Sequence, residues 1–255
     1  MFDFLILAAV FACASAGAWD LFTTDIPDEI PILLAGIGIF TWFIYAGQTM
    51  IYTNITNSII YGTLSLLTGF VLYKKGFWGL GDAALMSAVI YAIPQITLNF
   101  TVNIVFVGAF YSAIYAIIYS IKTPGILKMA LDDIKKYKLW FLITVAISSL
   151  SLFINIIYGI SMMVFTAGLL IFWRLSVHIE KHGFKRSIPA SDVREGDVLL
   201  EYKEWRGIKK HELKALHEKG GFVTVKEGVR FGPVFPIALI ITLIYGNLFL
   251  HLLGL

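Results

Sequence analysis

Two aspartates stand where apolar stretches of the sequence end or begin. Asp20 directly follows the first apolar run, in GAWDLFTTDIPDEIP, and Asp82 directly precedes a later one, in GFWGLGDAAL. An ionisable group at membrane depth is costly, so it is a functional candidate by default. Either aspartate alone is explained by a helix end, because a carboxylate like Asp82 favours the positive N-terminal dipole of the helix that follows. The two together favour a functional pair.

A pair of neighbouring carboxylates can catalyse the hydrolysis of a peptide bond. Two such groups cannot both be ionised cheaply, so one keeps a proton near neutral pH. The charged member takes a proton from water, while the protonated member hydrogen-bonds the scissile carbonyl and then protonates the leaving nitrogen. Gly79 and Gly81 precede Asp82. Because they lack Cβ, we expect the backbone there to adopt conformations closed to other residues and to admit an extended peptide.

The composition places these residues in a membrane protein. The 255 residues are 58% hydrophobic and only 15% charged, and the mean hydropathy is +0.80, which leaves too little polar surface for a soluble globule. A spanning helix needs about 20 mostly apolar residues. Several apolar runs of about this length occur, and two of the boundaries between them are inferred from polar residues. One boundary lies near Ile93 to Thr101 and the other near Asn155 to Gly159. The predicted runs are 2–19, 31–48, 56–73, 84–98, 101–121, 139–156, 157–174 and 234–253.

The distribution of positive charge predicts how these helices are oriented. All 20 Lys and Arg fall on or next to one set of loops, 20–30, 74–83, 122–138 and 175–233. The positive-inside rule therefore assigns this face to the cytoplasm and the N-terminus to the outside. Asp20 and Asp82 both lie at this cytoplasmic boundary. The net charge of +3 gives no reason to expect nucleic acid, and the basic residues are better explained by topology and by anionic lipid headgroups.

The predicted fold is an all-α polytopic membrane protein with a bundle of six to eight transmembrane helices. Residues 1–174 form the helical domain that carries both aspartates, 175–233 form a small mixed α/β cytoplasmic insertion, and 234–255 contain the final transmembrane helix. Within the insertion, 186–207 indicates short strands and turns. Residues 208–221 indicate an amphipathic helix that ends at Gly220 and Gly221. The first helix lacks a basic n-region, so we expect it to stay uncleaved.

Neither a metal nor a cofactor is expected. His178 and His182 have the i, i+4 spacing that can hold a metal ion on a helix, but no third ligand accompanies them and a helix face beside the membrane is the simpler explanation. The single cysteine, Cys13, excludes an internal disulfide and a cysteine-based zinc site. We expect it to pack in the core.

The two aspartate motifs resemble those of a known family. DLFTTDIPD, from Asp20 to Asp28, resembles the first catalytic motif of the type IV prepilin peptidases, an aspartate seven residues before a proline that Asp or Asn follows. GLGD, from Gly79 to Asp82, is similar to their second motif. The archaeal preflagellin and pilin peptidases are the nearest branch, because they too lack a cysteine-rich zinc segment and carry a cytoplasmic insertion before the last helix. Residues 228–246 resemble the final segment of that branch.

The resemblance implies a function and its site residues. The protein would be a membrane aspartyl endopeptidase with Asp20 and Asp82 as the catalytic pair, and Gly79, Gly81 and Pro27 would position the substrate or the aspartates. Its substrates would be preflagellin or prepilin precursors, cut at the cytoplasmic face of the cell membrane before their hydrophobic stretch. It would be a multi-pass protein with the lipid bilayer as its other partner. Asp25 and Asp28 are rivals to Asp20 that an exposed loop explains.

The chain departs from the family in two places. Ala84 stands where the family commonly has Lys, and the apolar pair at 139–174 exceeds the usual six or so spans. Two alternative functions use the same carboxylates. One is a protease of the presenilin or signal-peptide-peptidase type, although the chain lacks the Tyr-Asp and Pro-Ala-Leu of those proteins. The other is a small proton- or cation-coupled transporter, although the repeated halves common in transporters are not evident.

Overall fold

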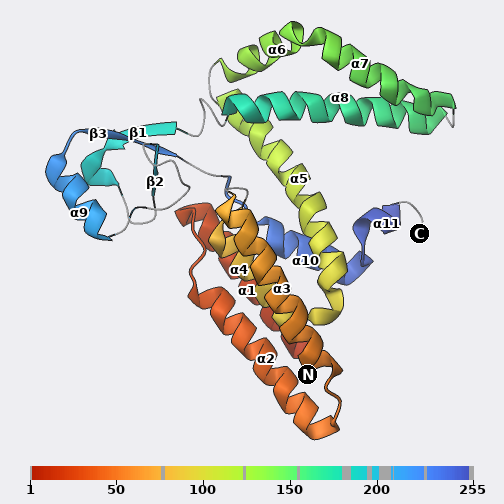
Figure 1. Cartoon of the computed structure of the whole chain (residues 1–255), viewed down its shortest axis with the longest axis vertical. Coiled ribbons are helices and arrows are strands. Elements are labelled where there is room, and N and C mark those ends of the chain that lie inside the picture. Colours follow the sequence, from red (N-terminus) through yellow and green to blue (C-terminus); the bar gives the residue numbers. More distant parts are fainter. Residues whose placement is uncertain are drawn as a thin grey trace. The chain divides into compact units, whose positions relative to one another are not determined.

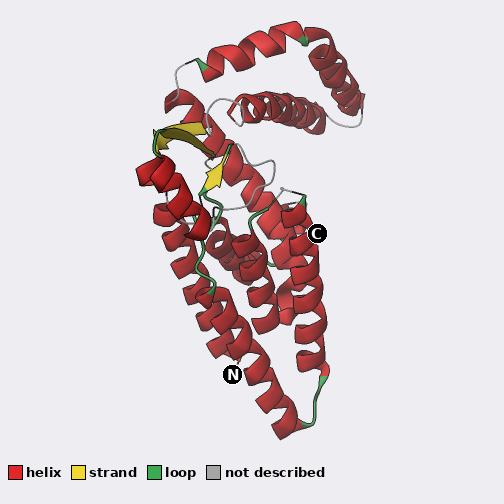
Figure 2. Ribbon diagram, turned by 60° about the vertical axis from the view of Figure 1, so that its left-hand side comes forward, coloured by secondary structure: helices red, strands yellow, loops and turns green. Residues whose placement is uncertain are grey.

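The computed structural model describes residues 2–75, 78–122, 125–153, 156–179, 185–193, 197–200, 208, 210–226 and 229–252. It is mostly helical with one small sheet, as Figures 1 and 2 show. The chain divides into two compact units, residues 1–111 with 229–255, and residues 112–228. Each unit has its own hydrophobic clusters. Both aspartates belong to the first unit.

The first unit contains the long apolar helices of the N-terminal half. Four helical segments are long and apolar enough to cross a membrane, namely Phe2–Thr23, Glu29–Thr49, Thr53–Lys74 and Pro94–Ile121. This finding supports the predicted membrane class, while the count of six to eight spans stays a prediction. The elements of this unit are α1 (Phe2–Thr23), α2 (Glu29–Thr49), α3 (Thr53–Lys74), α4 (Leu80–Ala92), the 3-10 turn η1 (Pro94–Ile96), the first part of α5 (Thr97–Lys122), α10 (Val234–Tyr245) and α11 (Leu248–Leu252).

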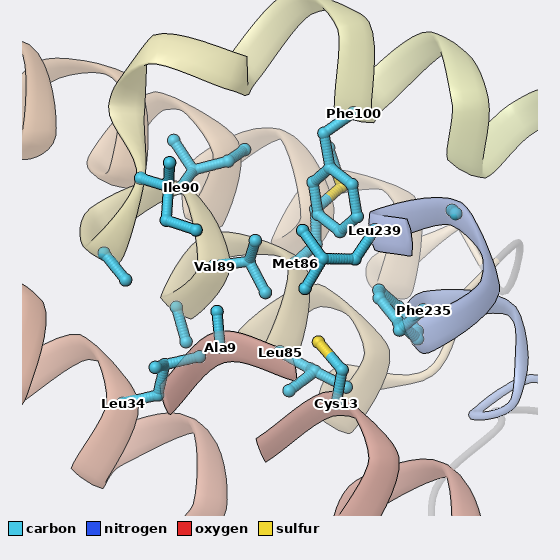
Figure 3. Close-up of a cluster of buried hydrophobic side chains, with 14 of the residues drawn as sticks. Ala9, Cys13, Leu34, Leu85, Met86, Val89, Ile90, Phe100, Phe235 and Leu239 are labelled. Atoms are coloured by element: carbon cyan, nitrogen blue, oxygen red, sulfur yellow. The ribbon is translucent and has the colours of Figure 1, made fainter. Parts of the chain in front are cut away.

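Helix α4 is the short central element of this unit, and α1, α2 and α3 pack against it. Figure 3 shows side chains of α1, α2, α4, α5 and α10 meeting in one apolar cluster, with Cys13 beside Leu85. Cys13 is fully buried there, as its predicted packing role requires. Small residues let the backbones approach closely, as is common between membrane helices. A Cβ at Gly69 of α3, for example, would lie 2.6 Å from the Cβ of Ala83.

Two glycines of α2 provide a test of this close packing. Gly38 is buried against α4, where an added Cβ would lie 2.6 Å from the Cα of Ala92, whereas Gly36 has nothing within 4 Å. We expect Gly38→Ala to lower the free energy of unfolding by about 1–3 kcal/mol, because the backbone of α4 cannot move aside cheaply. Gly36→Ala, the matched control, should raise it by about 0.5–1 kcal/mol through helix propensity. Thermal unfolding in detergent compares them, and equal stability of the two variants would contradict this packing.

The connection after α4 is tighter than the sequence predicts. The expected external turn near Ile93 to Thr101 is in fact the single turn η1, and Asn99 and Thr101 already belong to α5. Because α4 ends at Ala92, its last carbonyls have no partner within the helix and need other donors. The Trp42 Nε1 donates to the Ala92 carbonyl at 2.9 Å, and the Ser58 Oγ donates to the Tyr91 carbonyl at 2.6 Å.

The predicted final helix, 234–253, is wrong in one respect because it is broken at Gly246. This glycine has a φ of +67°, a left-handed conformation that side chains disfavour, and α11 begins only at Leu248. The buried Asn103 of α5 forms hydrogen bonds with residues on both sides of this break. Its Nδ2 donates to the Gly246 carbonyl at 2.7 Å and to Thr242 Oγ1 at 2.8 Å, and its Oδ1 accepts from the Leu248 N–H at 3.0 Å.

The second unit combines helices with the small sheet. Its elements, besides the end of α5, are α6 (Ile126–Lys136), α7 (Lys138–Ser149), η2 (Leu150–Phe153), α8 (Ile156–His178), β1 (Lys185–Pro189), η4 (Ala190–Asp192), β2 (Val198–Leu199), α9 (Lys210–Lys219) and β3 (Phe222–Lys226). The connection predicted at 122–138 contains the helix α6, and its cytoplasmic placement stays a prediction. The predicted division near Asn155 to Gly159 falls by the start of α8 at Ile156, while α7 already ends at Ser149. Asn155 itself lies outside the described residues.

The insertion has the predicted mixed character. Its antiparallel sheet has the order β1-β3-β2, and the yellow arrows of Figure 2 show these strands. Helix α9 confirms the predicted amphipathic helix, which ends at Gly220 and Gly221 with φ of +64° and +88°. Strand β3, directly after them, was not predicted. The sheet and α9 share a small core in which the buried residues are Val193, Leu199, Ile208 and Val225.

The histidine proposed as a weak metal candidate has another partner. His178 Nε2 lies 3.0 Å from Asp133 Oδ2, which joins α8 to α6. His182 lies outside the described residues. Within the part of the chain that the structure describes, no group of three or more His, Cys, Asp or Glu is arranged to hold a metal ion.

Candidate active site

Asp20 lies on the face of α1 that is turned into the core. The buried residues Leu5, Ala9, Cys13 and Ala16 follow one another at intervals of three or four, which places them on one side of a helix. Asp20 is the next position on this side, and only 6% of it is exposed. A carboxylate this buried requires partners from the protein.

The first partner of Asp20 comes from the far end of the sequence. The backbone N–H of Gly232 donates to Asp20 Oδ2 at 2.7 Å in a buried hydrogen bond. The close approach of this segment to α1 requires a glycine on each side of the contact, Gly232 and Gly17. A Cβ at Gly232 would lie 2.6 Å from the Cβ of Asp20, and a Cβ at Gly17 would lie 3.1 Å from the Gly232 carbonyl oxygen. The segment before α10 is therefore in direct contact with α1.

Arg230, two residues earlier, contacts the same end of α1. Its guanidinium donates to the carbonyl oxygen of Leu21, one of the last-turn carbonyls that have no partner within the helix. Its charge also interacts with the Asp20 carboxylate. Asp20 therefore accepts one buried N–H bond, and the guanidinium that bonds the end of its helix attracts it without forming a direct ion pair.

Asp82 lies in the first turn of α4, as the sequence predicts. Gly79 is the N-cap of this helix, and its backbone N–H interacts with the Asp82 carboxylate in the manner of a capping box. The positive end of the helix dipole also favours a carboxylate here. As a whole residue Asp82 is half-buried, whereas Asp20 is buried.

Gly79 and Gly81 are needed for space. Gly79 has an extended backbone, with φ of −73° and ψ of 150°, and neither glycine has a positive φ. Neither glycine therefore uses the backbone conformations that only glycine adopts easily. A Cβ at Gly79 would lie 2.8 Å from Asp82 Oδ2, and one at Gly81 would lie 3.0 Å from the Cβ of Ile26. The two glycines admit the carboxylate and the buried side chain of Ile26.

Asp20 and Asp82 lie near facing ends of two helices in the same unit. Helices α1 and α4 pack against each other, and the charge of the Asp20 carboxylate acts directly on that of Asp82. The rivals Asp25 and Asp28 are both exposed in the loop after α1, where Asp25 Oδ1 accepts a hydrogen bond from the N–H of Ile26 at 3.0 Å. Pro27 lies in this loop, and its carbonyl accepts from the N–H of Ile30 at 3.1 Å.

An aromatic cluster beside the site was not recognised from the sequence. Trp78, just before the second motif, stacks on Phe235 with ring centroids 6.3 Å apart and meets Phe231 edge-on at 6.3 Å. Phe231 lies between Arg230 and Gly232. Two sequence signals cover this segment. Residues 228–246 resemble the final segment of the archaeal branch, and the glycine and proline of GVRFGP mark a turn, but neither signal predicts the contact with Asp20.

Comparisons with protein-family models, curated proteins and solved structures give no match to this chain. The resemblance of its two motifs to the prepilin peptidases therefore stays a prediction.

Proposed function

We propose that the protein is a membrane aspartyl endopeptidase that removes the short N-terminal signal segment from preflagellin or type IV pilin-like precursors. The observation that carries this proposal is the placement of two carboxylates, the buried Asp20 and the half-buried Asp82, at the ends of two apolar helices that pack against each other. The order and spacing of their motifs favours this substrate class. The charge distribution favours the cytoplasmic face as the place of cleavage.

The chemistry needs one ionised and one protonated carboxyl group. The ionised carboxylate takes a proton from a water molecule, whose oxygen then attacks the scissile carbonyl carbon. The protonated carboxyl group hydrogen-bonds the carbonyl oxygen during this attack. When the carbon–nitrogen bond breaks, the leaving nitrogen takes a proton from the carboxyl group. After the cut the two groups have swapped protonation states. Transfer of one proton between them restores the starting state, so the pair can cleave another molecule.

The inhibitor profile of cleavage tests this chemistry. In membranes that contain the protein and a preflagellin or prepilin, we expect the precursor to become shorter, and we expect chelators and serine- or cysteine-directed reagents to leave the rate unchanged. The only cysteine, Cys13, is fully buried away from such reagents. Electrophoretic mobility of the precursor measures cleavage. Loss of cleavage on adding a chelator would instead indicate a metallopeptidase.

A further inference from the structure

We propose that Arg230 is a positioning residue for Asp20, which fixes the end of α1 and supplies the positive charge that makes Asp20 the base of the pair. Asp82 is then the acid. This inference rests on the proposed peptidase function and deepens it, because it assigns a different role to each aspartate. It also names a cation at the site, which the motifs themselves do not contain, since Ala84 carries no charge.

The segment 229–233 holds α1 at two adjacent residues. Arg230 donates to the Leu21 carbonyl, and the Gly232 N–H donates to the Asp20 side chain. A guanidinium at a helix C-terminus bonds a free carbonyl and complements the negative end of the dipole. The backbone that carries Asp20 and the carboxylate itself are thus held by the same short segment.

The segment is itself anchored between these two contacts. The Phe231 ring meets Trp78 and Phe235 edge-on, at centroid distances of 6.3 and 6.1 Å. On α5, a Cβ at Gly108 would lie 2.6 Å from Phe231 Cζ, so this ring also lies directly on the helix backbone. An aromatic side chain packed on several sides has little freedom to move. Arg230 and Gly232, its neighbours, are accordingly fixed in place.

The charges around Asp20 favour the same assignment. A guanidinium stays protonated in proteins, and a buried negative charge needs such a partner. Among the charged groups that act on Asp20, Arg230 is attractive and Asp25 is repulsive, while Asp82 interacts with it across the pair. Lys74, an alternative cation from α3, places its Nζ over the Phe70 ring at 5.4 Å from the centroid. Asp20 is the member of the pair that has both a cation and a buried N–H bond.

Two substitutions of Arg230 separate its charge from its hydrogen bond. Arg230→Gln keeps a donor for the Leu21 carbonyl but removes the charge, and we expect kcat to fall about tenfold or more with KM within about twofold. Arg230→Lys keeps the charge, and we expect kcat within about threefold of the unchanged protein. Lys128→Gln, which removes an exposed cation of α6, is the matched control and should leave kcat unchanged. Purified full-length variants are compared on a preflagellin or prepilin substrate, with unfolding temperatures measured alongside.

The outcomes distinguish this inference from the proposed function. Unchanged kcat for Arg230→Gln would overturn the role of Arg230, and so would a kcat of Arg230→Lys as low as that of Arg230→Gln at an unchanged unfolding temperature. If Arg230→Gln does not fold, the kcat of Arg230→Lys decides. A kcat within about threefold of the unchanged protein supports the role of Arg230, and a larger fall overturns it. By contrast, cleavage by Asp20→Asn or Asp82→Asn variants at the unchanged rate would overturn the peptidase function itself, whatever Arg230 does.

Discussion

Replacing either Asp20 or Asp82 with asparagine is expected to lower the rate of precursor cleavage by about a hundredfold to ten-thousandfold. Asparagine has nearly the same shape as aspartate, but it neither takes a proton from water nor gives one to a leaving nitrogen. The amide oxygen can still accept the hydrogen bond that Gly232 donates to Asp20, so the fold should persist. The rate of appearance of shortened preflagellin or prepilin in co-expressing cells measures the effect, and membrane extraction checks insertion.

The neighbouring acidic residues provide matched controls for this experiment. Asp25 and Asp28 follow Asp20 closely in the sequence, but both are exposed in the loop before α2. We expect Asp25→Asn and Asp28→Asn to keep cleavage within about threefold of the unchanged protein, because both charges are exposed and Asp25 has the smallest of the effects on Asp20, below that of Arg230. Cleavage that survives in Asp20→Asn and is lost in Asp25→Asn would show that the first motif is assigned to the wrong aspartate.

Gly232→Ala is expected to have the second largest effect, a fall in cleavage of about a hundredfold. The added Cβ would lie 2.6 Å from the Cβ of Asp20, an atom that side-chain rotation cannot move because it is attached directly to the α1 backbone. The segment must then shift away from α1, and its 2.7 Å hydrogen bond to Asp20 Oδ2 is lost. A displacement of about 1 Å in a catalytic group can cost a hundredfold in rate. Initial cleavage rates of the purified variant measure this.

A glycine with open space around it controls for the substitution itself. Gly47 of α2 has nothing within 4 Å of its added Cβ, so Gly47→Ala should cleave at the unchanged rate. If Gly232→Ala also cleaves at that rate with an unchanged unfolding temperature, then the segment 229–233 does not hold Asp20 in the active protein. The assignment of Asp20 would then depend on its motif alone.

The inward direction of Asp20 could be predicted from local pattern, and the contacts of Asp20 could not. The apolar residues of α1 recur at helical spacing, so the position of Asp20 on their side follows from the periodicity of one helix. Gly232 and Arg230 are more than 200 residues away in the sequence. The residue pattern within one segment does not show which distant turn contacts which helix end. The contacts of Gly232 and Arg230 with the end of α1 could therefore be found only from the folded structure.

The errors in the predicted helices have a common physical origin. Hydropathy finds apolar residues, but it does not find where the backbone must turn. Residues 234–253 are mostly apolar, yet the helix breaks at Gly246, where the buried Asn103 supplies the missing hydrogen bonds. Conversely, the charged residues of 122–138 marked a connection between spans but did not indicate a helix, although α6 is amphipathic and buries Ile126. In both places packing from another segment decides the conformation.

The measurement that tests the central claim most directly is cleavage by the purified protein alone. The full chain, reconstituted in liposomes with a purified preflagellin or prepilin, is incubated without any other protein and the products are analysed by mass spectrometry. We predict two products from one cut, with the new N-terminus after a small residue and before the hydrophobic stretch of the precursor. The Asp20→Asn and Asp82→Asn proteins should leave the precursor intact. Two results would contradict the proposed role of this aspartate pair: the folded, unchanged protein leaves the precursor intact, or either variant makes the same cut.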